Sequence, residues 1–438
     1  MAPPNDPPLP EAYASPDKYL ESARFHLTHT FKPSLSSRTT AVPPDGHDAV
    51  TVSYALCGSE DPSSKVLVWI NGLGHHRLAS MLLDGVCRKH NVRLLTFDRP
   101  SAGRSTPLGD AFSREPYRDR VELVAETLLE LLTVHEIRRF SLLSHSNGVI
   151  YTLYFLLQLA RRRSSSSGQD QDGDGARFEC LEWFMTSPWI SPKISGSVGL
   201  SIASSLPTTV TAKLGGFVEG VEKVIGPVGW SYGIAKEWVG WSAGIVSTPT
   251  AIRNEAADSS TTRARRRTSK EQIESFETLQ SLKPVEERTF AGRYLPPGLL
   301  DRAMKRAVEE GLQGMGVEAV MSLRSDPSVS WGWLRGDEGD NDRDEAGIDE
   351  HELYERGFEK LKRAVDENDW HLEVKVWCAG QDGMIPRKGR DWFRNLVVDR
   401  LGIVEARAFK EAEKAGHDEI LGLECVIEDV LTTVQQRP

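Results

Sequence analysis

The sequence contains few cysteines and no long apolar segment. Its five cysteines are odd in number, scattered, and never spaced as CxxC. This pattern predicts reduced thiols rather than a disulfide framework or a zinc site. No apolar run is long enough to span a bilayer, and the proline-rich N-terminus has no basic region followed by an apolar one. We therefore expect a cytoplasmic protein without a signal peptide or a transmembrane segment.

A surplus of basic residues is also missing. Asp and Glu number 63 against 53 Lys and Arg, and the net charge of −10 argues against nucleic acid or an anionic membrane as the partner. The sequence lacks a glycine-rich phosphate loop, a metal-ligand cluster and a nicotinamide fingerprint. It therefore implies no cofactor and no metal, and the expected partner is a small molecule. The oligomeric state is left open.

Apolar runs alternate with segments of helical spacing in the first half of the chain. "KVLVWINGLG" (65–74) is a continuous apolar run that ends in a glycine turn, as a strand buried on both faces does. Further strands are predicted at 49–58 (as an edge strand), 92–105, 140–143 and 180–189, and helices at 77–90, 118–138 and from about 148. Strand and helix in short alternation predict an α/β fold, with a mostly parallel central sheet and helices on both faces.

The pattern changes after Trp189 and resumes near residue 351. Residues 190–350 have almost no strand-like runs and predict a helical cap inserted after the sixth strand, with charged low-complexity loops. The expected units are 1–20 (disordered lead), 21–189 (first part of the core), 190–350 (cap) and 351–438 (second part of the core). The last unit is expected to hold helices at 351–367, near 388–401 and after 418, and strands at 372–380 and in "VEARAF" (404–409).

The stretch "SHSNG" (144–148) lies between a predicted strand and a predicted helix. A nucleophile elbow places a serine on such a sharp turn, and the residues two before and two after it must be small. Ser144 and Gly148 hold those positions around Ser146, although glycine is usual where Ser144 stands. Ser144 itself does not fit as the nucleophile, because Leu142 would then hold a small-residue position. The pattern predicts Ser146 as the nucleophile.

A serine hydroxyl needs a base, and the base needs an orienting acid. Asp382 follows the strand-like "LEVKVWCAG", and His417 lies in a Gly-His loop after the last predicted strand. Each residue taken alone could instead be a turn cap or a surface loop residue. The tetrahedral intermediate also needs two backbone N–H donors, for which Asn147 and Leu73 are the candidates. Gly72 would let the backbone at Leu73 approach.

These motifs resemble those of the α/β-hydrolase superfamily. "NGLGHH" is similar to its oxyanion loop with Asn71 in place of a histidine, and "FDRPSAGRS" to its D-x-P-G-x-G-x-S loop with Ser101 in place of a glycine. "SHSNG", "GQDGMIP" and "AGH" resemble the elbow, the acid loop and the histidine loop. Within the superfamily the chain looks most like fungal hydrolases with long helical caps. The resemblance implies that Asp98 is structural and holds the loop after its strand.

A serine at the elbow argues against the epoxide hydrolases and haloalkane dehalogenases of this superfamily, which resemble one another in using aspartate there. The remaining activities are hydrolysis of an ester, thioester or lactone, with amide and carbon–carbon bonds left open. An apolar substrate is expected from the aromatic residues of the cap. The predicted substrate-binding residues are His75, Trp189, Trp230, Trp238 and Trp241. The alternatives are a non-catalytic binding or scaffold protein of the same fold, and a protein whose cap inserts into lipid.

Overall fold

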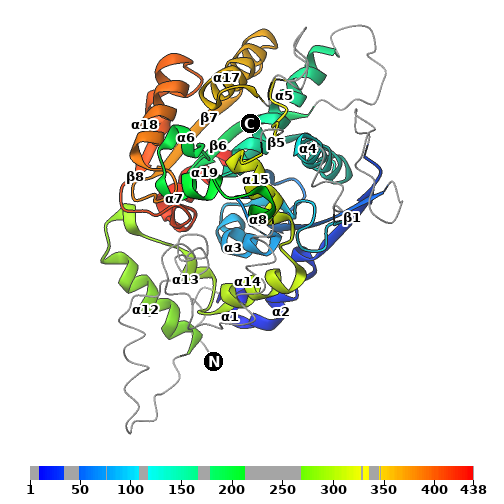
Figure 1. Cartoon of the computed structure of the whole chain (residues 1–438). Coiled ribbons are helices and arrows are strands. Elements are labelled where there is room, and N and C mark those ends of the chain that lie inside the picture. Colours follow the sequence, from blue (N-terminus) through cyan, green and yellow to red (C-terminus); the bar gives the residue numbers. More distant parts are fainter. Residues whose placement is uncertain are drawn as a thin grey trace.

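A single eight-stranded sheet runs through the described part of the chain (Figure 1). The computed structural model describes residues 9–33, 49–74, 76–107, 117–165, 178–212, 268–326, 329–334, 345 and 347–437. The strands are β1 (Leu27–Phe31), β2 (Val50–Gly58), β3 (Lys65–Ile70), β4 (Val92–Phe97), β5 (Arg139–His145), β6 (Glu179–Thr186), β7 (Glu373–Ala379) and β8 (Phe409–Ala412). Their order is β1-β2-β4-β3-β5-β6-β7-β8, and β2 is antiparallel to both neighbours while β4 through β8 run parallel. The predicted fold class is confirmed.

Helices cover both faces of the sheet, and each face buries its own apolar cluster. Val66, Val68 and Ile70 of β3 belong to one cluster, and Leu67 and Trp69 to the other, because successive side chains of a strand point to opposite faces. The first cluster includes side chains of α4 (Tyr117–Val134), α5 (Gly148–Ser165), α17 (Glu350–Glu367) and α18 (Arg387–Arg394); the second includes side chains of α3 (Met81–Lys89) and α19 (Glu424–Gln436). Such two-sided burial explains why the central strands read as continuous apolar runs.

The described residues of the segment between β6 and β7 form helices joined by irregular stretches, with one isolated β-bridge between Thr289 and Leu423. Its helices are α6 (Pro192–Ser195), α7 (Val198–Ser204), α8 (Thr208–Thr211), α12 (Ser269–Ser281), α13 (Ala291–Tyr294), α14 (Leu299–Glu310), α15 (Gly314–Leu323) and then α17. Both α14 and α15 bury apolar side chains in the core clusters. In Figure 1, α14 lies beside α1 (Glu11–Ala14) and α2 (Pro16–Leu20), close to the start of the described chain. Residues 213–267, which contain Trp230, Trp238 and Trp241, lie outside the described residues.

Three predictions about local structure were wrong. Residues 11–20 form α1 and α2 rather than a disordered lead, because Tyr13 and Tyr19 are buried against the core. The strand β2 is not an edge strand, since the short β1 pairs with it on the outside. "VEARAF" is mostly not a strand: a 3-10 helix spans Ala406–Ala408, and β8 begins only at Phe409. The proline-rich composition of 1–20 predicted disorder, and β1 and β8 are too short and polar to give a clear strand pattern.

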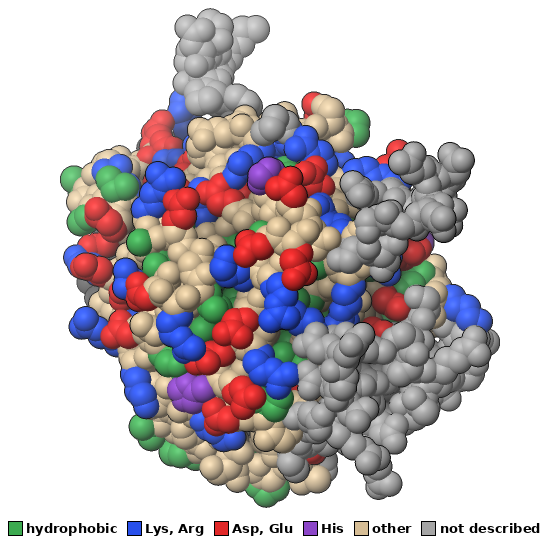
Figure 2. Space-filling view, turned by 90° about the horizontal axis from the view of Figure 1, so that it is seen from above, with side chains coloured by type: hydrophobic (Ala, Val, Ile, Leu, Met, Phe, Trp, Pro, Cys, Tyr) green, Lys and Arg blue, Asp and Glu red, His purple; other side chains and the backbone are tan. Residues whose placement is uncertain are grey.

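Charges of both signs lie on the face seen from above the view of Figure 1. Figure 2 shows acidic and basic side chains interspersed among the described residues of that face. Among the described residues, no helix is both long and apolar enough to cross a membrane.

Candidate active site

Ser146 lies on a strained turn between β5 and α5. Its backbone φ of 51° is in the left-handed region, which residues with a side chain rarely occupy. Neighbouring backbone holds it there, since the Ser146 N–H donates to Thr186 O at 3.1 Å and the Trp189 N–H donates to Ser146 O at 3.0 Å. Strain of this kind persists only where the surroundings enforce it, and it lifts the side chain away from both the strand and the helix.

The positions two residues from Ser146 need small side chains for different reasons. A Cβ added at Gly148 would lie 2.3 Å from the carbonyl oxygen of Ile70, so the first turn of α5 packs directly on the end of β3. At Ser144 the hydroxyl is used inside the core, where it accepts a hydrogen bond from the indole Nε1 of Trp183 at 2.8 Å. The serine that replaces the usual glycine therefore has a structural partner.

Three loops at the carboxyl ends of the strands bring Ser146, His417 and Asp382 together. The Nε2 atom of His417 lies 2.9 Å from Ser146 Oγ, and its Nδ1 atom lies 2.6 Å from Asp382 Oδ2. Asp382 is held in turn, because its Oδ1 accepts the backbone N–H groups of Met384 at 2.9 Å and Ile385 at 2.8 Å. A carboxylate only accepts, so the proton of the neutral imidazole lies on Nδ1, and Nε2 is left to accept from the serine hydroxyl.

The side chains of Ser146, His417 and Asp382 are all buried, and burial strengthens the interactions between their charges. Burial alone would lower the pKa of His417, but the charge of Asp382, its hydrogen bond to Nδ1 and the charge of Asp418 raise that pKa to about 9. The imidazolium is therefore stabilised in place. The arrangement can accept a proton from a hydroxyl and hold the resulting positive charge next to a carboxylate.

A second histidine–carboxylate pair lies against His417 and was missed in the sequence. His145 is fully buried; its Nε2 lies 2.9 Å from Asp418 Oδ1, and its ring centre lies 5.2 Å from that of His417. Burial lowers the pKa of His145, and the charge on His417 acts in the same direction. The signal available in the sequence was only adjacency, since these residues directly precede Ser146 and directly follow His417.

His145, His417 and Asp418 are also a group among the described residues that could hold a metal ion. Their ligand atoms lie within 4.8 Å of one another. Both ring nitrogens of His417 already face Ser146 and Asp382, so a metal ion bound to this histidine would displace one of those contacts. The three side chains are therefore better explained as partners in hydrogen bonds than as ligands of a metal ion.

The predicted oxyanion residues lie beside the elbow. Because β3 pairs with β5 and Ile70 stands opposite Ser144, the loop that follows β3 and contains Leu73 runs next to Ser146. Asn147 begins the turn into α5, and its side-chain amide donates to Ser322 Oγ of α15 at 3.1 Å. That the two backbone N–H groups act together as donors stays a prediction.

The predicted substrate-binding residues are only partly described. The indole N–H of Trp189 donates to Ser322 O at 3.0 Å, and the side chain is 2% exposed, so it packs within the core beneath the elbow. His75 lies outside the described residues, as do the three tryptophans of 213–267. Their contact with a substrate stays a prediction.

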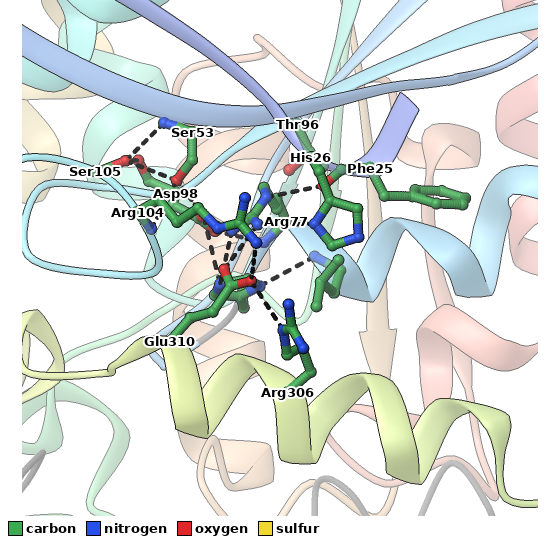
Figure 3. Close-up of polar contacts among 12 residues, drawn as sticks. Phe25, His26, Ser53, Arg77, Thr96, Asp98, Arg104, Ser105, Arg306 and Glu310 are labelled. Atoms are coloured by element: carbon green, nitrogen blue, oxygen red, sulfur yellow. Dashed lines mark hydrogen bonds and ion pairs between the residues drawn. The ribbon is translucent and has the colours of Figure 1, made fainter. Parts of the chain in front are cut away.

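Asp98 is buried and its side chain joins β2 to the start of the 3-10 helix Arg77–Ser80, whereas the resemblance implied that it holds the loop after its own strand. Its Oδ1 accepts the backbone N–H of Arg77 at 2.6 Å, and its Oδ2 accepts the hydroxyl of Ser53 at 2.6 Å (Figure 3). Figure 3 also shows Glu310 reaching this network from α14, where it pairs with Arg77 at 2.7 Å and Arg104 at 3.1 Å. The network ties the segment between β6 and β7 to the sheet.

No protein-family model matches this sequence, and no curated protein matches it. Similar solved structures include a carboxylesterase from Nitrososphaera gargenis, at 11% identity over 92% of this chain and 97% of that chain, with a TM-score of 0.42. The esterase RhEst1 from Rhodococcus sp. ECU1013 is similar at 13% identity over 91% and 98%, with a TM-score of 0.43. At these values the likeness says nothing about a reaction or a substrate, and the resemblance to fungal hydrolases finds no relative to support it.

Proposed function

We propose that this protein is a serine hydrolase that cleaves an ester, thioester or lactone bond through an acyl-enzyme. In this proposal Ser146 is the nucleophile, His417 the general base and Asp382 the acid that orients the histidine. The observation that carries it is the unbroken hydrogen-bond chain from Ser146 Oγ through both nitrogens of His417 to Asp382. This chain of hydrogen bonds begins at a serine whose backbone is in the left-handed region, at a strand-to-helix turn.

The reaction follows from the positions of these groups. Ser146 Oγ attacks the substrate carbonyl carbon while its proton passes to His417 Nε2, and the backbone N–H groups of Leu73 and Asn147 bind the resulting oxyanion. The intermediate collapses, and the leaving alkoxide or thiolate takes the proton from Nε2. Water then attacks the acyl-enzyme in the same way, which releases the acid and restores Ser146. None of these steps calls for a cofactor.

The proposed substrate is small and carries an apolar acyl group. The support is compositional: the segment 190–250 contributes Trp230, Trp238 and Trp241 and carries few charges. A panel of p-nitrophenyl esters of increasing chain length, with lactones and thioesters, would order the substrate classes. Hydrolysis confined to acetyl esters would contradict an apolar acyl site.

A fluorophosphonate probe separates the proposed enzyme from a non-catalytic protein of the same fold. The probe forms a covalent bond only with an activated serine, so we expect the wild-type chain to be labelled. Its ester hydrolysis should fall in proportion to the fraction of protein that is labelled. The measurement is in-gel labelling together with the mass of the modified peptide. Absence of labelling in the folded protein would favour the binding or scaffold function.

The pH dependence of the reaction should reflect the raised pKa of His417. The base must be neutral, so kcat/KM is expected to increase as the pH rises, with its midpoint near pH 9 and its plateau at still higher pH. The charge of Asp418 contributes to that raised pKa, so Asp418→Asn should move the midpoint to lower pH. The measurement is a kcat/KM profile corrected for uncatalysed hydrolysis.

The control for this profile is Asp366→Asn, which removes a carboxylate from an exposed pair with Lys362. Its midpoint should match that of the wild type, because a surface charge far from the site is screened. A midpoint that is the same in Asp418→Asn and the control would contradict the electrostatic role of Asp418.

A further inference from the structure

A buried cluster of charges joins α15 to the loops at the carboxyl ends of β3 and β4. Arg99 and Arg120 are 5% and 1% exposed, and Glu318 of α15 is 3% exposed. Glu318 receives two hydrogen bonds from Arg99, from Nε at 2.7 Å and Nη2 at 2.6 Å, and a third from Arg120 Nη2 at 3.0 Å. The carboxylate and the guanidinium of Arg99 therefore meet in a two-pronged contact of defined geometry.

The remaining donors of Arg99 point at the loop after β3. Nη1 donates to the carbonyl oxygen of Asn71 at 2.6 Å, and Nη2 donates to that of Gly72 at 2.6 Å. The guanidinium lies over the ring of Tyr151, 4.9 Å from its centre. One edge of the Arg99 guanidinium thus binds Glu318, and one face lies on Tyr151. Its other edge donates hydrogen bonds to the carbonyl oxygens of two successive residues of the loop.

The hydrogen bond from Arg99 to Gly72 O fixes the orientation of the peptide unit between Gly72 and Leu73. A trans peptide is planar, and its C=O and N–H point in opposite directions. Holding the Gly72 carbonyl toward Arg99 therefore turns the N–H of Leu73 to the opposite side, and that N–H is the proposed oxyanion donor. The same helix also packs on the next residue, because a Cβ added at Gly74 would lie 2.6 Å from Met315 Sδ of α15.

Stability alone gives a poor account of this cluster. A buried ion pair loses so much hydration that well-packed apolar residues are often as stabilising. Burial would raise the pKa of Glu318, yet the charges of Arg99 and Arg120 outweigh it and the pKa lies below its usual value. Glu318 is accordingly a carboxylate at neutral pH and carries the charge that fixes Arg99.

We propose that Arg99 and Glu318 are positioning residues for the oxyanion loop. The segment between β6 and β7 would then take part in the chemical step, through a carboxylate that aims a backbone donor, rather than only in substrate selection. This inference rests on the proposed function. It assigns to Glu318 an effect on the rate of the reaction with little effect on the binding of small esters.

The test compares Arg99→Lys and Glu318→Gln with Glu310→Gln. Glu310 is the matched control, because it joins the same segment to Arg77 and Arg104, whereas the bonds from Arg99 reach Asn71 and Gly72. With p-nitrophenyl acetate, we expect kcat to fall by about 10- to 100-fold in the first two variants, as misplacement of a catalytic group by about 1 Å does. KM and the pH midpoint should stay near the wild-type values, since His417 and Asp382 are untouched. The control should keep its kcat even if its melting temperature falls.

Amide hydrogen exchange of the segment 71–74 gives a readout that does not depend on activity. Exchange there should be faster in Arg99→Lys than in Glu310→Gln, because the loop loses the two hydrogen bonds from Arg99 to Asn71 O and Gly72 O. Equal exchange in both variants, or an equal loss of kcat in both, would overturn the inference. Wild-type protein that neither hydrolyses esters nor reacts with the probe would instead overturn the proposed function, and the exchange result would still show whether Arg99 orders the loop.

Discussion

Ser146→Ala is expected to lower kcat by at least about 10³-fold and to leave the fold intact. The substitution removes the hydroxyl that attacks the carbonyl, so only binding and the oxyanion donors remain to accelerate attack by water. The backbone strain at φ 51° is the same for alanine and serine, because both carry a Cβ. Steady-state hydrolysis of an activated ester measures the loss, and the thermal midpoint of unfolding checks the fold.

Ser144→Ala is the matched control for this loss. The change leaves the indole N–H of Trp183 buried without its 2.8 Å acceptor, which should lower the free energy of unfolding by about 1–3 kcal/mol. Probe labelling should persist in this variant. Labelling retained in Ser146→Ala but absent in Ser144→Ala would transfer the nucleophile's role to Ser144.

His417→Ala should be nearly as damaging as the loss of the serine, because nucleophile and base act as one unit. Without the imidazole, the 2.9 Å contact to Ser146 Oγ disappears and the hydroxyl keeps its proton at neutral pH. We expect a fall in kcat of at least about 10³-fold, measured with the same ester, and no reaction with the fluorophosphonate probe. Activity that persists with unchanged pH dependence would show that another group is the base.

Asp382→Asn tests the orienting acid by a different route. Since Oδ1 accepts two backbone N–H groups, the amide oxygen of asparagine will take that place and its NH₂ will face His417 Nδ1. The imidazole must then carry its proton on Nε2, the wrong tautomer for a base, which costs about 10⁴-fold in a related arrangement. A silent substitution would count against the proposed triad, because residues 186–189 after β6 offer no carboxylate in place of Asp382 and Asp418 is paired with His145.

The sequence alone determined the elements whose signals are local. Continuous apolar runs predicted β3, β4, β5 and β7 because strands buried on both faces have no polar side. The short motif around Ser146 predicted a turn, because a strand-to-helix corner restricts side-chain size within a few residues. The candidate residues Asp382 and His417 were found for the same reason, as each follows a recognisable strand or glycine turn.

Tertiary structure alone decided the contacts between residues far apart in the chain. Glu318 and Arg99 are 219 positions apart, and nothing near either residue marks it as the other's partner. The helices at 11–20 form because they pack on a sheet built from distant segments, although their own composition predicted disorder, and the short β1 forms by pairing with β2. Burial and charge pairing depend on which surfaces meet, and that is settled only when the chain has folded.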